Sequence, residues 1–206
     1  MAAAVSYPPQ PWHLAGHAYA SVWRVPEAEL PPLPEGTRPA VVGGSATVVT
    51  AWIDYQPPGQ LSYSELLATV TLAAAKPTAT ITDIWVDSEV SLAGGRELWG
   101  IPKDLAVFDF SPGRTFTATA ATGSDWIATA AFSDRFGLPL RVPAAFEIVQ
   151  TLGGALCRTP VRARSAARLA SARWNLNPSG ALGFLASRTP VLSLHLPGFE
   201  LHFGQV

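Results

Sequence analysis

The sequence contains a single cysteine, few charges and almost no lysine. Cys157 stands alone among 206 residues, which excludes a disulfide framework and any CxxC zinc or redox site. Charged residues make up 14% of the chain and the formal net charge is −1, which argues against a surface for nucleic acid or anionic membranes. Only two of the 14 basic residues are lysines, Lys76 and Lys103, and the rest are arginines. The position of each lysine therefore calls for a physical explanation.

Long hydrophobic runs are also missing. The longest, residues 66–75, contains two threonines and falls short of the roughly 18 residues that a membrane-spanning helix needs. The first residues, Met-Ala-Ala-Ala-Val-Ser-Tyr-Pro-Pro, carry neither a basic region nor a long apolar one, so we expect no export signal. We therefore expect a cytoplasmic globular protein that forms a single domain over residues 1–206, with no membrane partner.

The signatures of common cofactor sites do not occur either. Without GxGxxG, Walker A, HExxH or GxSxG motifs, dinucleotide, nucleotide, zincin and α/β-hydrolase functions lack their first requirement. His195, Glu200 and His202 could ligate a metal, although such residues more often lie on a strand surface. The arginines between residues 158 and 173 could bind a carboxylate or phosphate, although a solvated face or a subunit contact is favoured. We expect no cofactor and no metal.

Most of the chain has the composition of short strands separated by turn residues. Turn pairs between strand-like runs predict two hairpins: Gly123-Ser124 between 115–122 and 125–132, and Pro197-Gly198 between 191–196 and 199–203. Helix signals are limited to residues 63–67 and 144–153, the second bounded by Pro143 and a glycine pair. The sequence therefore predicts a β-dominated α+β domain, either a barrel or two packed sheets, with few short helices.

Lys103 lies in the segment Gly95-Arg96-Glu97-Leu98-Trp99-Gly100-Ile101-Pro102-Lys103-Asp104-Leu105-Ala106. Apolar residues surround it, and the nearby glycine and proline predict an irregular backbone. An amine in such a setting is desolvated, which disfavours its charged form. The neutral amine is a nucleophile that can attack a ketone to form an imine. A lysine that extends from a loop along apolar surface into solvent is the alternative interpretation of the same segment.

This segment resembles the active-site stretch of the acetoacetate decarboxylase family, whose pattern is close to G-R-E-L-x-x-x-P-K-K-L. The matching residues are Gly95, Arg96, Glu97, Leu98, Pro102, Lys103 and Leu105. Weaker similarity extends over most of the chain, including residues 22–24, the Tyr63-Ser64-Glu65 segment and residues 191–203. The resemblance implies the family's antiparallel β-barrel with flanking sheets, assembled into a homo-oligomer.

The resemblance also implies roles for individual residues. Lys103 is the expected Schiff-base lysine, and Glu65 is an acid/base or orienting carboxylate. Trp99 and Tyr63 are expected at the substrate. Arg96 and Glu97 are expected to pair and to orient the lysine loop.

Three positions depart from the family pattern. Asp104 stands where the family has a second lysine, so an opposite charge replaces a like charge beside the reactive amine. No arginine occurs between residues 14 and 21, where the family places one in its pocket, and His17 is the nearest basic group. Thr50 stands where the decarboxylase has a second pocket glutamate. With Asp104 and His17 as candidate substrate-binding groups, these changes indicate a substrate other than acetoacetate.

The leading hypothesis is a lysine-dependent lyase that acts on a keto acid or a related carbonyl compound. Its iminium would take up the electrons left by departing carbon dioxide, and would also support aldol-type condensation, retro-aldol cleavage or dehydration. Two alternatives remain open. One is an acid/base cyclase, dehydratase or isomerase of a specialised biosynthetic pathway that uses the same pocket without an imine. The other is a non-catalytic ligand-binding protein. The low charged fraction further predicts a homo-oligomer.

Overall fold

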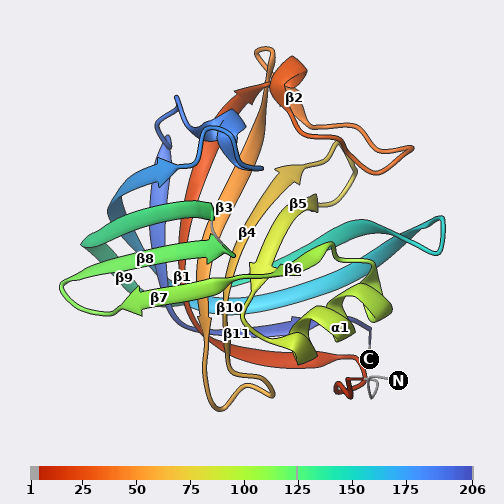
Figure 1. Ribbon diagram of the computed structural model, residues 1–206, viewed down its shortest axis with the longest axis horizontal. Coiled ribbons are helices and arrows are strands. Elements are labelled where there is room, and N and C mark those ends of the chain that lie inside the picture. Colours follow the sequence, from red (N-terminus) through yellow and green to blue (C-terminus); the bar gives the residue numbers. More distant parts are fainter. Residues whose placement is uncertain (1–4, 124, 206) are drawn as a thin grey trace.

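The computed structural model describes residues 5–123 and 125–205, and strands dominate these residues (Figure 1). The strands are β1 (Trp12–Pro26), β2 (Val41–Val42), β3 (Ser45–Tyr55), β4 (Tyr63–Thr71), β5 (Thr78–Val86), β6 (Lys103–Leu105), β7 (Val107–Ser111), β8 (Thr115–Thr122), β9 (Asp125–Leu152), β10 (Ala155–Leu176) and β11 (Leu192–Phe203). The α-helix α1 spans Glu89–Trp99, and two 3-10 turns span Glu27–Glu29 and Gly183–Leu185. No helix within the described ranges is long and apolar enough to cross a membrane.

The strands form one sheet that closes on itself. Its order is β6-β5-β4-β3-β1-β11-β10-β9-β8-β7, and β5 also pairs with β9, so the strands from β5 through to β9 form a ring. All pairings are antiparallel except β5 with β6 and β5 with β9, which are parallel. The predicted β-dominated fold with few helices is confirmed, and the ring with β7 and β8 beside it agrees with a barrel and a flanking sheet.

The two faces of β3 and β4 pack against different surroundings. Trp52 and Leu66 face a solid core that also contains Phe116 of β8 and Phe132 of β9. The alternate residues, among them Ile53 and Leu67, face the inside of the ring. Successive residues of a strand point to opposite faces, so a continuously apolar strand places hydrophobic side chains both in the solid core and inside the ring.

The strands β9 and β10 run beside each other over almost their whole length (Figure 1). The first part of β9 pairs with β8, as the Gly123-Ser124 hairpin signal predicted. Its last part pairs with β5, through Ala79 and Ile148. One strand thus belongs to both the flanking sheet and the ring, which places the two core regions side by side.

Both helix predictions from the sequence are wrong. Residues 63–67 begin β4, where hydrogen bonds to β3 and β5 on its two sides hold them extended. Residues 144–152 belong to β9 and pair with β10, and Phe146 and Ile148 alternate toward the interior of the ring. The partners of both segments are distant in sequence, so local pattern could not reveal them.

The second predicted hairpin is also wrong, because β11 continues through Pro197-Gly198 as one strand. It pairs with β1 on both sides of this dipeptide, with Leu196 opposite Ala18 and Phe199 opposite Gly16. The dipeptide forms a bulge in the strand, which bends the chain without reversing it.

The helix α1 was not predicted from the sequence. Ser88 caps its start by accepting a hydrogen bond from the Ser91 amide at 3.2 Å, and Gly100 ends it in a left-handed conformation with φ 68°. The interior glycines Gly94 and Gly95 lower the local helix propensity. A Cβ on Gly94 would lie 2.4 Å from the Trp12 ring, so glycine allows the helix to pack closely against the ring of strands.

The homo-oligomer stays a prediction, and we expect copies to meet at exposed apolar residues of β9 and β10. Phe136 and Leu140 of β9 are 64% and 69% exposed, and Leu169, the partner of Phe136 on β10, is 45% exposed. We expect the wild-type chain to sediment well above its monomer mass of 21.8 kDa. Replacing Phe136 and Leu140 by Asp should shift it toward that mass, because charges there oppose apolar contact. A wild-type monomer at micromolar concentration would contradict the prediction.

Candidate active site

The ring of strands encloses a cavity of about 590 Å³. Most of its lining is aliphatic or aromatic and comes from the inward faces of the ring strands. Trp99, the last residue of α1, and Ile101, which follows the helix, also line it. Among the described residues that line it, only Glu65 and Lys103 carry formal charge. The side chain of Lys103 is 5% exposed and that of Glu65 is 3% exposed. The cavity is therefore an apolar space with one buried ion pair in its wall.

The backbone around α1 delivers Lys103 to this wall. After Gly100 the Ile101 amide donates to the Gly95 carbonyl at 3.1 Å, which turns the chain back along the helix. The strand β6 then pairs with β5, with Lys103 beside Ile84. The lysine stem crosses the helix at Gly95, where an added Cβ would lie 2.8 Å from Lys103 Cδ. Glycine at this position leaves the space through which the amine reaches the cavity.

Arg96 binds the backbone of the segment that carries Lys103. Its Nε donates to the Lys103 carbonyl at 2.7 Å, and its Nη2 contacts Asp104 Oδ1 at 2.5 Å. Glu97 instead accepts a hydrogen bond from the Tyr7 hydroxyl at 2.6 Å. Arg96 thus contacts the backbone of Lys103, whereas the expected Arg96–Glu97 pair is wrong, because each side chain has a different partner.

The amine of Lys103 has three polar neighbours. Its Nζ donates to Glu65 Oε2 at 3.0 Å, to Ser91 Oγ at 2.8 Å and to Tyr63 Oη at 3.4 Å. These groups come from β4 and α1, elements that are separated in sequence. A buried ammonium group needs such hydrogen-bond partners, and the Glu65 carboxylate is close enough to accept a proton from it.

Two tyrosines complete the surroundings of the carboxylate. Tyr55 donates to Glu65 Oε1 at 3.1 Å and Tyr63 donates to Oε2 at 3.4 Å, and the two rings stack 4.4 Å apart. Burial, together with the charge of Glu65, raises the pKa of both hydroxyls well above 10. Both tyrosines therefore remain protonated hydrogen-bond donors at neutral pH.

The structure brings together some of the residues proposed from the sequence. Lys103, Glu65, Tyr63 and Trp99 all line the cavity, and the Trp99 ring packs edge-on against Trp12 at one end of it. These placements make the four side chains accessible to one ligand.

Asp104 and His17 do not line the cavity. The Asp104 side chain is 66% exposed and binds Arg96, because neighbouring residues of β6 point to opposite faces. His17 lies beside His195, with ring centroids 5.8 Å apart. The prediction that Asp104 and His17 bind the substrate is therefore wrong. Thr50 is also outside the cavity, where it accepts a hydrogen bond from Trp23 at 2.9 Å.

Sequence reasoning missed Tyr55 and Ser91. Tyr55 lies directly opposite Tyr63 in the β3–β4 pair, so the register of these strands was needed to find it. Ser91 reaches Lys103 only because α1 is helical, and its position three residues after the Ser88 cap was the available signal.

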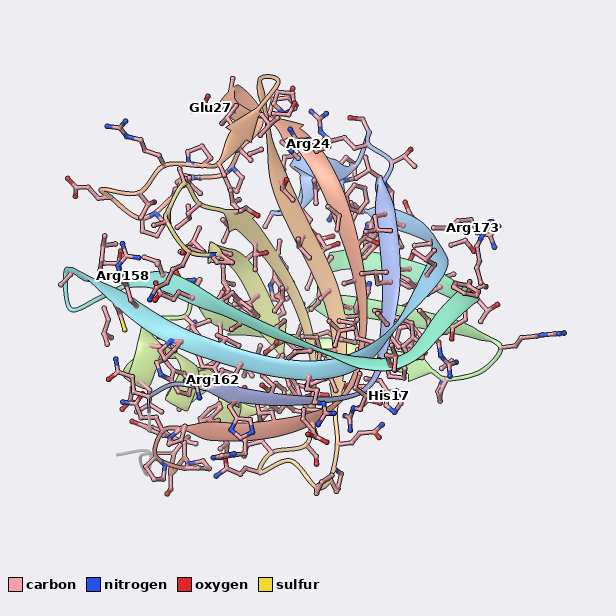
Figure 2. The ribbon with its side chains drawn as sticks, turned by 180° about the vertical axis from the view of Figure 1, so that it is seen from behind. His17, Arg24, Glu27, Arg158, Arg162 and Arg173 are labelled. Atoms are coloured by element: carbon pink, nitrogen blue, oxygen red, sulfur yellow. The ribbon has the colours of Figure 1, made fainter. Side chains whose placement is uncertain are left out.

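The arginines between residues 158 and 173 have different partners, since Arg158 lies 3.6 Å from Glu147 and Arg168 lies 3.0 Å from Asp134. Figure 2 shows Arg158 and Arg173 on opposite sides of the molecule.

Comparison of the sequence with models of known protein families identifies one family. A family model described as acetoacetate decarboxylase matches residues 2–148. A search of curated proteins gave no match.

Several solved structures share the fold. An acetoacetate decarboxylase from Legionella pneumophila is 17% identical, with 99% of this chain and 90% of that chain covered and a TM-score of 0.74. An acetoacetate decarboxylase-like enzyme from Sphingomonas wittichii RW1 is 15% identical, with coverages of 96% and 91% and a TM-score of 0.70. The enduracididine biosynthesis enzyme MppR, complexed with pyruvate, is 19% identical, with coverages of 98% and 90% and a TM-score of 0.66. At these identities the structural likeness shows the fold, whereas the family model matches most of the sequence. The chain belongs to the acetoacetate decarboxylase family.

Proposed function

We propose that the chain is a lysine-dependent lyase in which Lys103 forms an imine with a keto acid or a related carbonyl compound. The observation that carries the proposal is the burial of the Lys103 amine in the wall of an apolar cavity, 3.0 Å from Glu65. Membership of the acetoacetate decarboxylase family supports it. MppR, which has the same fold, was solved with pyruvate, a keto acid.

The ion pair supplies the neutral amine that the reaction needs. Transfer of one proton from Lys103 Nζ to Glu65 leaves a free amine and a carboxylic acid, so two buried charges disappear together. The amine lone pair then attacks the carbonyl carbon, and the electrons of the carbon–oxygen π bond move to the oxygen. Glu65 returns its proton to this oxygen, and the attached nitrogen, which is now positively charged, loses a second proton to Glu65. Glu65 passes this second proton to the hydroxyl group, which leaves as water while the nitrogen lone pair forms the iminium.

The iminium is the electron acceptor for the bond cleavage. With a 3-oxo acid, the electrons of the bond to the carboxylate move into the iminium, carbon dioxide leaves and an enamine remains. Glu65 takes up a proton from solvent and delivers it to the enamine carbon, and hydrolysis of the resulting iminium releases the ketone and returns the lysine. Tyr55 and Tyr63 hold the Glu65 oxygens in place through both steps, since each donates to one of them.

A second candidate function uses the same groups without an imine. Glu65 is held by two protonated tyrosines, an arrangement suited to proton transfer in a cyclase, dehydratase or isomerase. Covalent trapping of the lysine separates the two functions.

Reduction with borohydride in the presence of pyruvate should label Lys103. The expected product is a secondary amine on this residue, found by intact mass and by peptide mapping. Lys76 is the internal control, because its side chain is 77% exposed and lies 3.7 Å from Glu147. Lys103→Met should remove the label. A label on Lys76 alone, or an unchanged label in Lys103→Met, would contradict the proposal.

Glu65→Gln should slow imine formation by roughly 10²- to 10⁴-fold, because an amide keeps the shape of the carboxylate but cannot carry the proton. The measurement is the rate of borohydride-trapped label on Lys103. Glu97→Gln is the matched control, since Glu97 is an exposed glutamate that binds Tyr7. Equal rates for Glu65→Gln and Glu97→Gln would exclude Glu65 from the proton transfer.

Acetoacetate should be a poor substrate, because no second cation lines the described cavity to bind its small carboxylate. Asp104→Lys should change the release of carbon dioxide by no more than about fivefold, since Asp104 forms an exposed ion pair with Arg96. Efficient turnover by the wild-type chain would show that acetoacetate is accepted. A large gain in Asp104→Lys would show that this position acts on the amine despite its exposure.

A further inference from the structure

The cavity extends well beyond the reactive pair. Along β4 its lining includes the alternate residues Glu65, Leu67, Thr69 and Thr71. From Glu65 to Thr71 the strand advances six residues, which corresponds to about 20 Å. On β3 the lining continues from Ile53, the register partner of Glu65, to Val49, the partner of Thr69. A ligand bound at Lys103 therefore has a long wall beside it.

This remote part of the cavity is kept wide by small residues. Ala20, Ala51, Ala163 and Ala167 line it from three different strands, β1, β3 and β10. The volume of about 590 Å³ lies in the range of sites for ligands much larger than a four-carbon acid. A family member that used only the small acid would leave most of this space unfilled.

Three polar side chains of the remote wall already form hydrogen bonds within the protein. Thr69 Oγ1 donates to the Val49 carbonyl at 3.4 Å, and Thr78 Oγ1 donates to the Lys76 carbonyl at 2.9 Å. Ser165 Oγ donates to the Ala166 carbonyl at 2.7 Å. Since no charged side chain besides Glu65 and Lys103 lines the described cavity, a charge on the part of a ligand that lies inside the cavity would be buried without a partner.

We propose that the cavity selects carbonyl compounds whose chain beyond the carbonyl is an uncharged hydrocarbon of at least several methylenes. This inference rests on the proposed function for the placement of the carbonyl at Lys103. The hydrocarbon lies along the β3–β4 wall, and the exposed lining residues Pro77, Val142 and Ala144 mark where the cavity meets solvent. Any carboxylate of the substrate is confined to the carbonyl end, beside the amine.

A homologous series of straight-chain aldehydes, from propanal to decanal, tests whether the cavity binds a hydrocarbon chain. Each is trapped on Lys103 with borohydride, and the half-saturating concentration is measured. It should fall about fourfold per added methylene until the cavity is filled. For chains short enough to end inside the cavity, an aldehyde of the same length that ends in a carboxylate should bind at least tenfold more weakly than the plain one. Equal half-saturation along the series, or equal binding of the carboxylate, would overturn the inference.

A variant that fills the remote end provides a second test. In Val49→Trp the gain in affinity with chain length should stop at a shorter aldehyde than in the wild type, because the indole ring would occupy the remote wall. Ala145→Trp is the control, because Ala145 is the exposed neighbour of the cavity residue Ala144 on β9. It should leave the chain-length profile unchanged. A wild-type profile in Val49→Trp would contradict the placement of the chain along β3 and β4.

Straight-chain alcohols separate a failure of this inference from a failure of the proposed function. Alcohols form no imine, so their binding, followed by tryptophan fluorescence, reports the cavity alone. Length-dependent binding of alcohols without any Lys103 label would overturn the imine and support the hydrocarbon site. Labelling of Lys103 without length dependence in either series would support the imine and overturn the hydrocarbon site.

Discussion

The short parallel contact between β5 and β9 is the constraint on which the interior of this protein depends. Thr78 and Ala79 pair with Glu147 and Ile148, and this contact converts an open sheet into a ring. The buried Gln150 reinforces it by donating to the Ile81 carbonyl at 3.0 Å. Without this closure the inward residues of β4, including Glu65, would face solvent. The closed ring gives them a low-dielectric environment, in which a charge needs a partner.

The division of the apolar residues between two regions explains how the ring can hold a cavity. The flanking strands β7 and β8 pack against the ring around Trp52, Leu66 and Phe132, and these side chains are almost fully buried. Close packing there supplies the burial that stabilises the fold. The other face of the same strands can then carry small residues such as Ala51 and leave open space for a ligand.

The chemistry of the cavity follows from the position of one helix. The closely packed α1 brings Ser91 to the amine, leaves room for the lysine stem at Gly95 and places Arg96 on the Lys103 carbonyl. The strands contribute Glu65 and the tyrosines that hold it. The ion pair of Lys103 and Glu65 is thus held from two directions, by α1 and by the strands β3 and β4.

The sequence by itself determined the β-rich character, the hairpin at Gly123-Ser124 and the segment that relates Lys103 to its family. These features depend on local composition or on a short motif. The tertiary structure alone decided that residues 63–67 form a strand, that β11 continues through Pro197-Gly198, and that Asp104 faces solvent. It also decided that Tyr55 contacts Glu65 and that Ser91 contacts Lys103. Each of these outcomes depends on pairing or packing between distant segments, and a single sequence records neither the register nor the partner.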